Sequence, residues 1–262
     1  MRLIITRPAA QAAPWLPRLA QAGVDATALP LIEIEASPDA AALQRAWAGL
    51  PGLAFTMFVS ANAVQHFFAA RPAGAAWPAA LQAGSTGPGT AAALRAAGLA
   101  ASQVVTPDPA GGRFDSEGLW ALIGTRQWRG TEVLVLRGEE GRNWLSERWR
   151  EAGAQVHFVA AYRRVSPALD APGRALLAQA VACPGGHAWH FSSGEAIQRL
   201  CALAPGADWS AATALVTHER IEAVARHRGF GRVILVGAGV DEALRGLSRV
   251  SADSPSVQSG AS

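Results

Sequence analysis

Short apolar stretches alternate along this chain with segments of helical periodicity. Runs of consecutive apolar residues are typical of strands buried on both faces, and the segments between them carry apolar residues at helical spacing. The alternation predicts a parallel α/β architecture. The predicted strands cover residues 3–6, 26–35, 54–59, 81–84, 104–105, 133–136, 155–162, 188–191, 212–216 and 233–236.

Helices are predicted between these strands, the first over residues 9–22 and the last over 240–247. Pro30 interrupts the second predicted strand. Residues 248–262 are rich in Ser, Gly, Pro and Ala and show no periodicity, and 251–262 are expected to form a disordered tail.

The chain also contains an internal repeat. Residues 58–64 (FVSANAV) are similar to 191–197 (FSSGEAI), and 84–98 are similar to 214–229 at a nearly constant offset. Two copies of one α/β unit would explain both similarities. A length of 262 residues also favours two domains.

Composition narrows the class of protein. Half of the residues are apolar and 16% are charged, which excludes disorder for the bulk of the chain. The first residues lack the features of a signal peptide, and no apolar stretch approaches the roughly 20 residues of a membrane span. We therefore expect a cytoplasmic protein without a membrane partner.

The charged residues, cysteines and histidines further limit the functions that the protein can have. All 23 basic residues are arginine, so Schiff-base lysines and a P-loop lysine are excluded. The net charge of +3 is small and the arginines are scattered, which argues against nucleic acid. Scattered guanidinium groups suit an acidic small molecule. Cys183 and Cys201 have no metal spacing, and His187 and His190 would face opposite sides of one strand, so no metal site is expected.

Nine short segments, in order, resemble the uroporphyrinogen-III synthase family over nearly the whole chain. Each segment alone is a weak signal, but their common order and spacing is strong. They are 5–8 (ITRP), 29–34 (LPLIEI), 58–64 (FVSANAV), 87–90 (GPGT), 115–117 (DSE), 136–142 (LRGEEGR), 161–164 (AYRR), 191–193 (FSS) and 217–221 (THERI).

The resemblance implies two flavodoxin-like parallel-sheet domains joined by a two-strand ladder, the second inserted into the first. Residues 1–34 and 167–250 would form one domain and 36–164 the other. It also implies a substrate cleft between the domains, lined by loops at the carboxyl ends of the strands.

The implied reaction closes hydroxymethylbilane into uroporphyrinogen III, with loss of water and inversion of the terminal pyrrole ring. The substrate also cyclises unaided to the uninverted isomer, so the enzyme mainly imposes one geometry. No cofactor is implied. We expect a monomer, to which the preceding bilane-forming enzyme would hand the substrate.

Tyr162 is the only tyrosine, and it falls where the family places its cleft tyrosine. A phenol there would donate a hydrogen bond to the leaving hydroxyl as a general acid. The alternative is an amphipathic residue that only lines the pocket.

The other candidates are groups that bind carboxylates: helix-opening hydroxyls and amides, a glycine loop and guanidinium groups. The structural alternatives are helix capping, a tight turn and surface ion pairs, the last favoured for Arg142. The candidates for substrate binding are Arg7, Ser60, Ala61, Asn62, Gly87, Pro88, Gly89, Thr90, Arg137, Ser192, Ser193, Gly194, His218 and Arg220.

At Arg220 the chain departs from the family pattern, in which many relatives carry threonine. A His218–Arg220 pair would still bind carboxylates but would not supply a hydroxyl. Two rival functions fit the sequence less well. A hinge-type binding protein for an acidic small molecule would normally be exported, and the missing signal peptide argues against it. A nucleotide-using transferase should show acidic metal ligands at strand ends, and the sequence shows no such pair.

Overall fold

The computed structural model describes residues 1–108, 114–139 and 142–252. The chain forms two compact units, which are described separately below. Unit 1 consists of Met1–Glu33 and Val165–Ser262, and unit 2 consists of Ile34–Arg164. Unit 2 is therefore inserted into the chain of unit 1.

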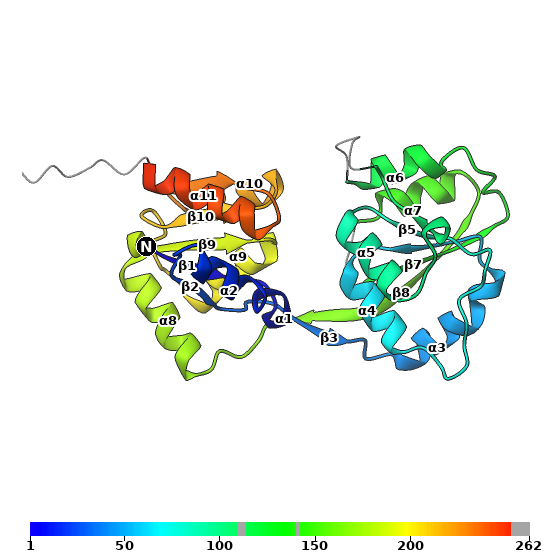
Figure 1. Ribbon diagram of the computed structural model, residues 1–262, viewed down its shortest axis with the longest axis horizontal. Coiled ribbons are helices and arrows are strands. Elements are labelled where there is room, and N and C mark those ends of the chain that lie inside the picture. The colour runs from blue at the N-terminus through cyan, green and yellow to red at the C-terminus, as the bar shows by residue number, and fades with distance from the viewer. Residues whose placement is uncertain (109–113, 140–141, 253–262) are drawn as a thin grey trace, which may run out of the picture. The chain divides into compact units, whose positions relative to one another are not determined.

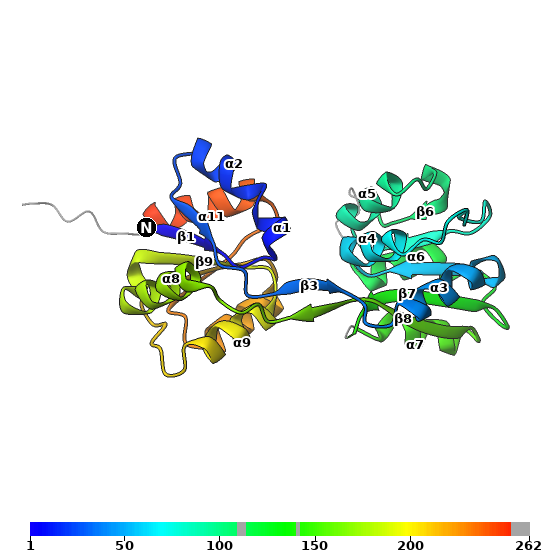
Figure 2. The ribbon, with the colours of Figure 1, turned by 90° about the horizontal axis from the view of Figure 1, so that it is seen from below.

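Unit 1 is built on a parallel five-stranded sheet with the order β11-β10-β9-β1-β2. Helices cover both faces, with α2 and α11 on one and α8 and α9 on the other (Figure 2). The strands are β1 (Arg2–Ile5), β2 (Ala26–Ala28), β9 (His187–Phe191), β10 (Thr213–Val216) and β11 (Arg232–Leu235). The helices are α1 (Ala9–Ala12), α2 (Trp15–Gln21), α8 (Ala171–Ala182), α9 (Gly194–Leu203), α10 (Glu219–His227) and α11 (Val240–Ala252).

Unit 2 holds a six-stranded sheet with the order β3-β8-β7-β4-β5-β6. Figure 1 draws this unit in light blue to green. Its strands are β3 (Glu33–Ala36), β4 (Phe55–Phe58), β5 (Ala83–Ser85), β6 (Val104–Val105), β7 (Glu132–Gly138) and β8 (Gln155–Val165). Its helices are α3 (Ala40–Gly49), α4 (Ala61–Ala69), α5 (Pro88–Ala96), α6 (Ser116–Ile123) and α7 (Trp144–Glu151).

The chain crosses between the units through β3 and β8, which are neighbours in this sheet and point in opposite directions in Figure 2. Arg163 of β8 donates to Glu35 of β3 with a nitrogen–oxygen distance of 2.6 Å. The pair is exposed, so its contribution to stability is small. Parallel sheets in two α/β units, the second inserted into the first, confirm the predicted fold class.

The two sheets share one spatial order once the chain order is permuted. Strands β9, β10 and β11 occupy the places of β4, β5 and β6, and β1 and β2 occupy those of β7 and β8. Unit 1 thus has the 2-1-3-4-5 order of flavodoxin-like folds, and unit 2 adds β3 to a circular permutation of it. The sequence repeat falls on these equivalent elements, because its copies are β4–α4 with β9–α9 and β5–α5 with β10–α10.

Each sheet buries apolar side chains on its faces. In unit 2, Phe58, Phe67 and Leu136 belong to one cluster, and Phe55 and Trp149 belong to another. In unit 1, Leu3, Ile5, Trp15 and Leu215 pack with α11. The continuous apolar runs of the central strands follow from this burial on both sides.

Two predicted elements near the N-terminus are corrected. The helix expected over 9–22 is two helices, because Pro14 has no N–H for an intrahelical bond and separates α1 from α2. Pro17 is tolerated in the first turn of α2, where amide groups have no intrahelical partner. The strand expected over 26–35 divides at Pro30 into β2 and β3, which belong to different sheets.

The C-terminal expectation is also corrected in part. Helix α11 continues to Ala252, so residues 248–252 are helical rather than irregular. Arg232 donates to the carbonyls of Val250 and Arg249 at 3.0 and 2.9 Å, which satisfies acceptors in the last turn. Residues 253–262 of the expected tail lie outside the described residues. In the described part of the chain, no helix is long and apolar enough to cross a membrane.

Candidate functional site

Both units present polar groups where parallel strands end. In such sheets ligands bind beyond the carboxyl ends of the strands, at the point where the chain order reverses. That point lies between β1 and β9 in unit 1 and between β4 and β7 in unit 2. Ser60 and Arg137 stand at the reversal point of unit 2, and Arg7 and Ser193 stand at that of unit 1.

Ser60 and Tyr162 are brought together at the strand ends of unit 2. Ser60 is the N-cap of α4, and its Oγ accepts the N–H of Ala63 at 3.2 Å. The same hydroxyl donates to Oη of Tyr162 at 3.2 Å, although the two residues are 102 positions apart in sequence. The Tyr162 side chain is 2% exposed and packs in the cluster of Phe58 and Leu136.

Gly138 and His66 flank the Tyr162 ring. The register between β7 and β8 shifts between Arg137 and Gly138, so that Gly138 pairs with Tyr162. A Cβ at Gly138 would lie 3.2 Å from Cε2 and Cζ of the ring. The His66 ring stacks on the Tyr162 ring at a centroid distance of 6.1 Å, and burial lowers the pKa of His66. The imidazole of His66 and the space left by Gly138, which has no side chain, thus border the phenol.

We expect Gly138→Ala to disturb the Tyr162 ring. The added methyl must displace a ring that is held in a packed core, which costs about 1–2 kcal/mol of unfolding free energy. Displacement of Oη by a few tenths of an ångström should lower kcat several-fold, because catalysis depends on alignment. Urea midpoints and steady-state rates measure both effects.

Gly49→Ala is the matched control, because a Cβ there meets no atom within 4 Å. It should leave kcat unchanged. Equal losses of kcat in the two variants would contradict a specific role for the space at Gly138.

The other predicted residues of unit 2 are placed as follows. Gly87 is the N-cap of α5 without a side-chain cap, Pro88 and Gly89 are in the first turn, and Thr90 is buried. Ala61 and Asn62 open α4 and are half-buried. The amide groups of a helix start without a capping side chain can receive an anion.

Two arginines of unit 2 contact other side chains of the same unit. Arg137 lies 4.2 Å over the Phe158 ring and donates to Asn143 at 2.9 Å. Arg142 forms an ion pair with Glu117 at 2.9 Å, so the favoured surface-pair interpretation of Arg142 is confirmed.

Unit 1 repeats the helix starts with different side chains. Ser193 is the N-cap of α9 and accepts the N–H of Glu195 at 3.1 Å, Gly194 follows it, and Ser192 is exposed. His218 is the N-cap of α10, and its Nδ1 accepts the N–H of Arg220 at 3.0 Å. The proton of a neutral His218 ring is therefore on Nε2. Both His218 and Arg220 are exposed and available to a carboxylate.

Arg7 is held more deeply than the other candidate arginines. Its guanidinium lies 4.2 Å over the Trp15 ring and donates from Nη2 to the carbonyl of Ala238 at 2.6 Å. Its Nε is buried without a hydrogen-bond partner among the described residues. Burial lowers the pKa of Arg7 from its ordinary value, although a guanidinium remains charged in proteins.

His190 lies in the same part of unit 1 and is fully buried. Its ring packs edge-on against Trp15 with centroids 4.8 Å apart, and within the described residues neither ring nitrogen has a hydrogen-bond partner. Burial, and then the charge of Arg7, lower the pKa of His190 to about 3. The imidazole is therefore neutral beside the buried guanidinium.

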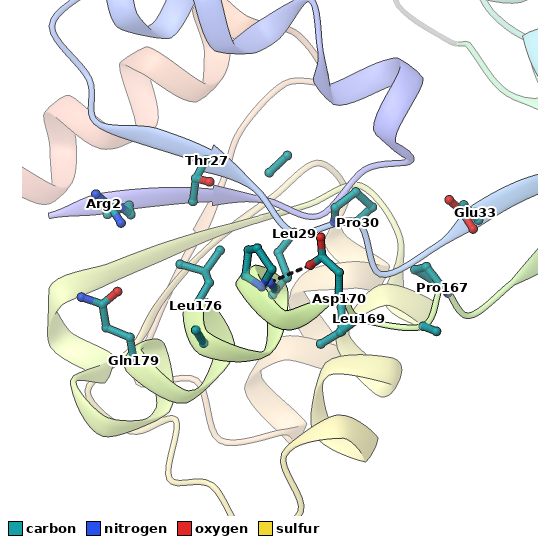
Figure 3. Close-up of a pocket in the computed structure, with 15 residues that line it drawn as sticks. Arg2, Thr27, Leu29, Pro30, Glu33, Pro167, Leu169, Asp170, Leu176 and Gln179 are labelled. Carbon is teal, nitrogen blue, oxygen red and sulfur yellow. Dashed lines mark hydrogen bonds between the residues drawn. The ribbon is translucent and has the colours of Figure 1, made fainter.

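A groove of about 590 Å³ lies between strand β2 and helix α8 of unit 1 (Figure 3). Apolar side chains, among them Leu29 and Leu176, line it together with Arg2 and Glu33. The Asp170 carboxylate accepts the N–H of Gly173 at 2.8 Å and so caps α8. None of the predicted site residues lines this groove.

The sequence predicted roles for Tyr162 and Arg7 but did not predict the residues that contact them. Trp15 supports Arg7, and Gly138 makes room for Tyr162. The strand predicted over 133–136 ends two residues before Gly138. The sequence therefore gave no indication that Gly138 pairs with Tyr162. Among the described residues, no group of three His, Cys, Asp or Glu side chains is arranged to hold a metal ion.

The fold and these strand ends define a two-unit parallel α/β protein whose polar and cationic groups gather where the strands end. The family model described as uroporphyrinogen-III synthase HemD matches residues 14–238. The chain belongs to the uroporphyrinogen-III synthase family. It is accordingly an enzyme of tetrapyrrole biosynthesis that acts on a small molecule.

Similar proteins agree with this family. A uroporphyrinogen-III synthase of Salmonella typhimurium is 30% identical over 94% of this chain and 100% of its own length. One of Proteus mirabilis is 31% identical over 63% of this chain and 81% of its own length. The fold is similar to that of crystal structures of uroporphyrinogen III synthases from Thermus thermophilus and Helicobacter pylori. The Thermus thermophilus structure has a TM-score of 0.65 and 18% identity over 97% of this chain and 100% of its own. The Helicobacter pylori structure has a TM-score of 0.61 and 14% identity over 95% of this chain and 100% of its own.

Proposed function

We propose that this chain cyclises hydroxymethylbilane to uroporphyrinogen III, with loss of water and inversion of the terminal pyrrole ring. The observation that carries the proposal is the family match over residues 14–238. The buried Tyr162 at the strand ends supports it, because the reaction needs one proton donor at the leaving hydroxyl.

Tyr162 acts as the general acid in this proposal. Its hydroxyl donates a proton to the substrate hydroxymethyl oxygen, the carbon–oxygen bond breaks, and water leaves. The far pyrrole attacks the resulting cation, and the ring then fragments and recloses in the reversed orientation. The proton that the pyrrole loses on reclosure restores the phenol, so the enzyme is unchanged after one turnover.

In this proposal, arginine and histidine side chains and helix starts at the strand ends bind the substrate carboxylates. Arg220 and His218 are suited to this role because they are exposed at the start of α10. The N–H groups of Gly89 and Thr90, at the start of α5 that no side chain caps, suit another carboxylate; Pro88 between Gly87 and Gly89 has no N–H. Arg7, Arg137, Ser192, Ser193, Gly194, Ala61 and Asn62 complete the proposed set, whose common effect is to fix one folded geometry of the substrate.

The remaining proposals concern the protein as a whole. The proposed domains, residues 1–34 with 167–250 and residues 36–164, differ from the two units by at most two residues where the chain crosses between them. The enzyme is a cytoplasmic monomer that uses no cofactor and receives its substrate from the preceding bilane-forming enzyme. Its location is supported by the biosynthetic role of its bacterial relatives.

Product isomers formed from bilane generated in situ test this function. The purified protein should form the type III isomer in an amount far above its own molar amount. A hinge-type binding protein would at most retain bilane stoichiometrically and leave the spontaneous type I product. Type I formation at the spontaneous rate would contradict the proposal.

A further inference from the structure

We propose that Ser60 is a positioning residue for Tyr162 that orients the phenol hydroxyl and connects it to the N-terminus of α4. The inference rests on the proposed function, in which Tyr162 is the general acid. It assigns to Ser60 an action through the phenol rather than direct binding of a substrate carboxylate.

The first step is that the protein itself engages the Ser60 hydroxyl as both acceptor and donor. Its Oγ accepts the N–H of Ala63 at 3.2 Å, and its own proton is donated to Oη of Tyr162 at 3.2 Å. The backbone of Ser60 is extended, with φ −160° and ψ 162°, as an N-cap requires. No proton of Ser60 remains for a substrate carboxylate in this arrangement.

The second step concerns the phenol proton. Oη of Tyr162 accepts from Ser60, and among the described residues no acceptor is found for the proton that Oη carries. A phenol whose lone pair is engaged has its O–H direction restricted. The bond from Ser60 therefore leaves the Tyr162 proton without an acceptor among the described residues, and this is the proton that the proposal assigns to the substrate hydroxyl.

The third step is electrostatic. The N–H groups at the start of a helix carry partial positive charge, and hydrogen bonds in series polarise one another. The series from Ala63 through Ser60 to Tyr162 ends on the oxygen that becomes negative when it gives up its proton. Ser60 therefore stabilises the transition state more than the bound substrate, which predicts an effect on kcat rather than on KM.

The single tyrosine makes a direct test possible. Protein with ¹³C at the tyrosine Cζ gives one carbon resonance, which reports on the hydrogen bonds of Tyr162 alone. In Ser60→Ala this resonance should shift, kcat should fall by about 10-fold, and KM should change less than about twofold. Ser60→Thr keeps the hydroxyl and should restore both the resonance and kcat.

Capping is separated from hydrogen-bond donation by Ser60→Gly. Glycine caps a helix nearly as well as serine, so this variant keeps α4 but lacks the donor. It should show the same shifted resonance and the same loss of kcat as Ser60→Ala. Ser193→Ala removes the equivalent N-cap of α9, and it should leave the tyrosine resonance unmoved because the Ser193 hydroxyl binds the amide of Glu195 instead of a phenol.

A double-mutant comparison decides whether Ser60 acts through Tyr162. In a Tyr162→Phe background, Ser60→Ala should cause no further loss of kcat. A full 10-fold loss in that background, or a raised KM with unchanged kcat, would overturn the inference in favour of direct substrate contact. An unmoved resonance in Ser60→Ala would overturn it as well. The resonance reports the bond without turnover, so failure to form type III isomer would refute the proposed function separately.

Discussion

Replacement of Tyr162 by phenylalanine should lower kcat by about 10-fold or more, with little change in the free energy of unfolding. The ring stays packed among Phe58 and Leu136, and only the hydroxyl that receives the bond from Ser60 is lost. Without a donor at the leaving hydroxyl, loss of water must proceed with solvent as the acid. Initial rates with bilane made in situ measure the effect.

Thr56→Val is the matched control for Tyr162→Phe. It removes another buried hydroxyl of unit 2, which donates to the carbonyl of Gln82 at 3.1 Å within the sheet. We expect a loss of stability and a kcat within about twofold of the unaltered enzyme. If kcat of Tyr162→Phe equalled kcat of this control, Tyr162 would only line the site and would not act as the general acid.

The stability of unit 1 should fall steeply in mild acid because of His190. Burial keeps the folded pKa of His190 at about 3, whereas an unfolded histidine titrates near 6.5. As the pH falls from 6.5 toward 3, His190 is therefore protonated in the unfolded state but stays neutral in the folded state. At pH 4.5 this linkage removes about 3 kcal/mol of unfolding free energy relative to pH 7.5.

His190→Leu tests this linkage, because leucine removes the titrating group and both unpartnered nitrogens. The measurement is the unfolding of unit 1 in urea at each pH. It is monitored by hydrogen exchange of the β1 and β9 segments, and the labelling pulse is always applied at the same pH. Between pH 7.5 and 4.5, the free energy of unfolding of the variant should fall by about 3 kcal/mol less than that of the unaltered protein. His227→Gln, at the exposed end of α10, is the control. The same acid loss with leucine at position 190 would exclude His190 as the cause.

Local patterns were sufficient to predict the parallel α/β class. Apolar runs predicted β4, β7, β9 and β10 as strands, because strands buried on both faces have no polar alternation. The repeat indicated equivalent helix starts, and Ser60 and Ser193 do occupy equivalent N-caps. These features depend on residues close together in sequence, where helix periodicity and capping are decided.

The parts that sequence did not predict depend on residues that are distant in the chain. The bond between Ser60 and Tyr162 requires β4 and β8 to enter one sheet on either side of β7. The extra turns of α11 require Arg232 to reach its last carbonyls. Burial of His190 without a partner among the described residues contradicts the general rule that buried polar groups are hydrogen-bonded, so composition gave no reason to expect it.

The central claim is that groups of this chain alone impose ring inversion on a reactive substrate. Its most direct test is the isomer composition of product formed by protein that has been treated with a chelator and freed of nucleotides. The account predicts that the type III fraction rises with protein concentration and that each protein molecule completes many turnovers. Type I product alone, at a rate independent of protein concentration, would contradict it.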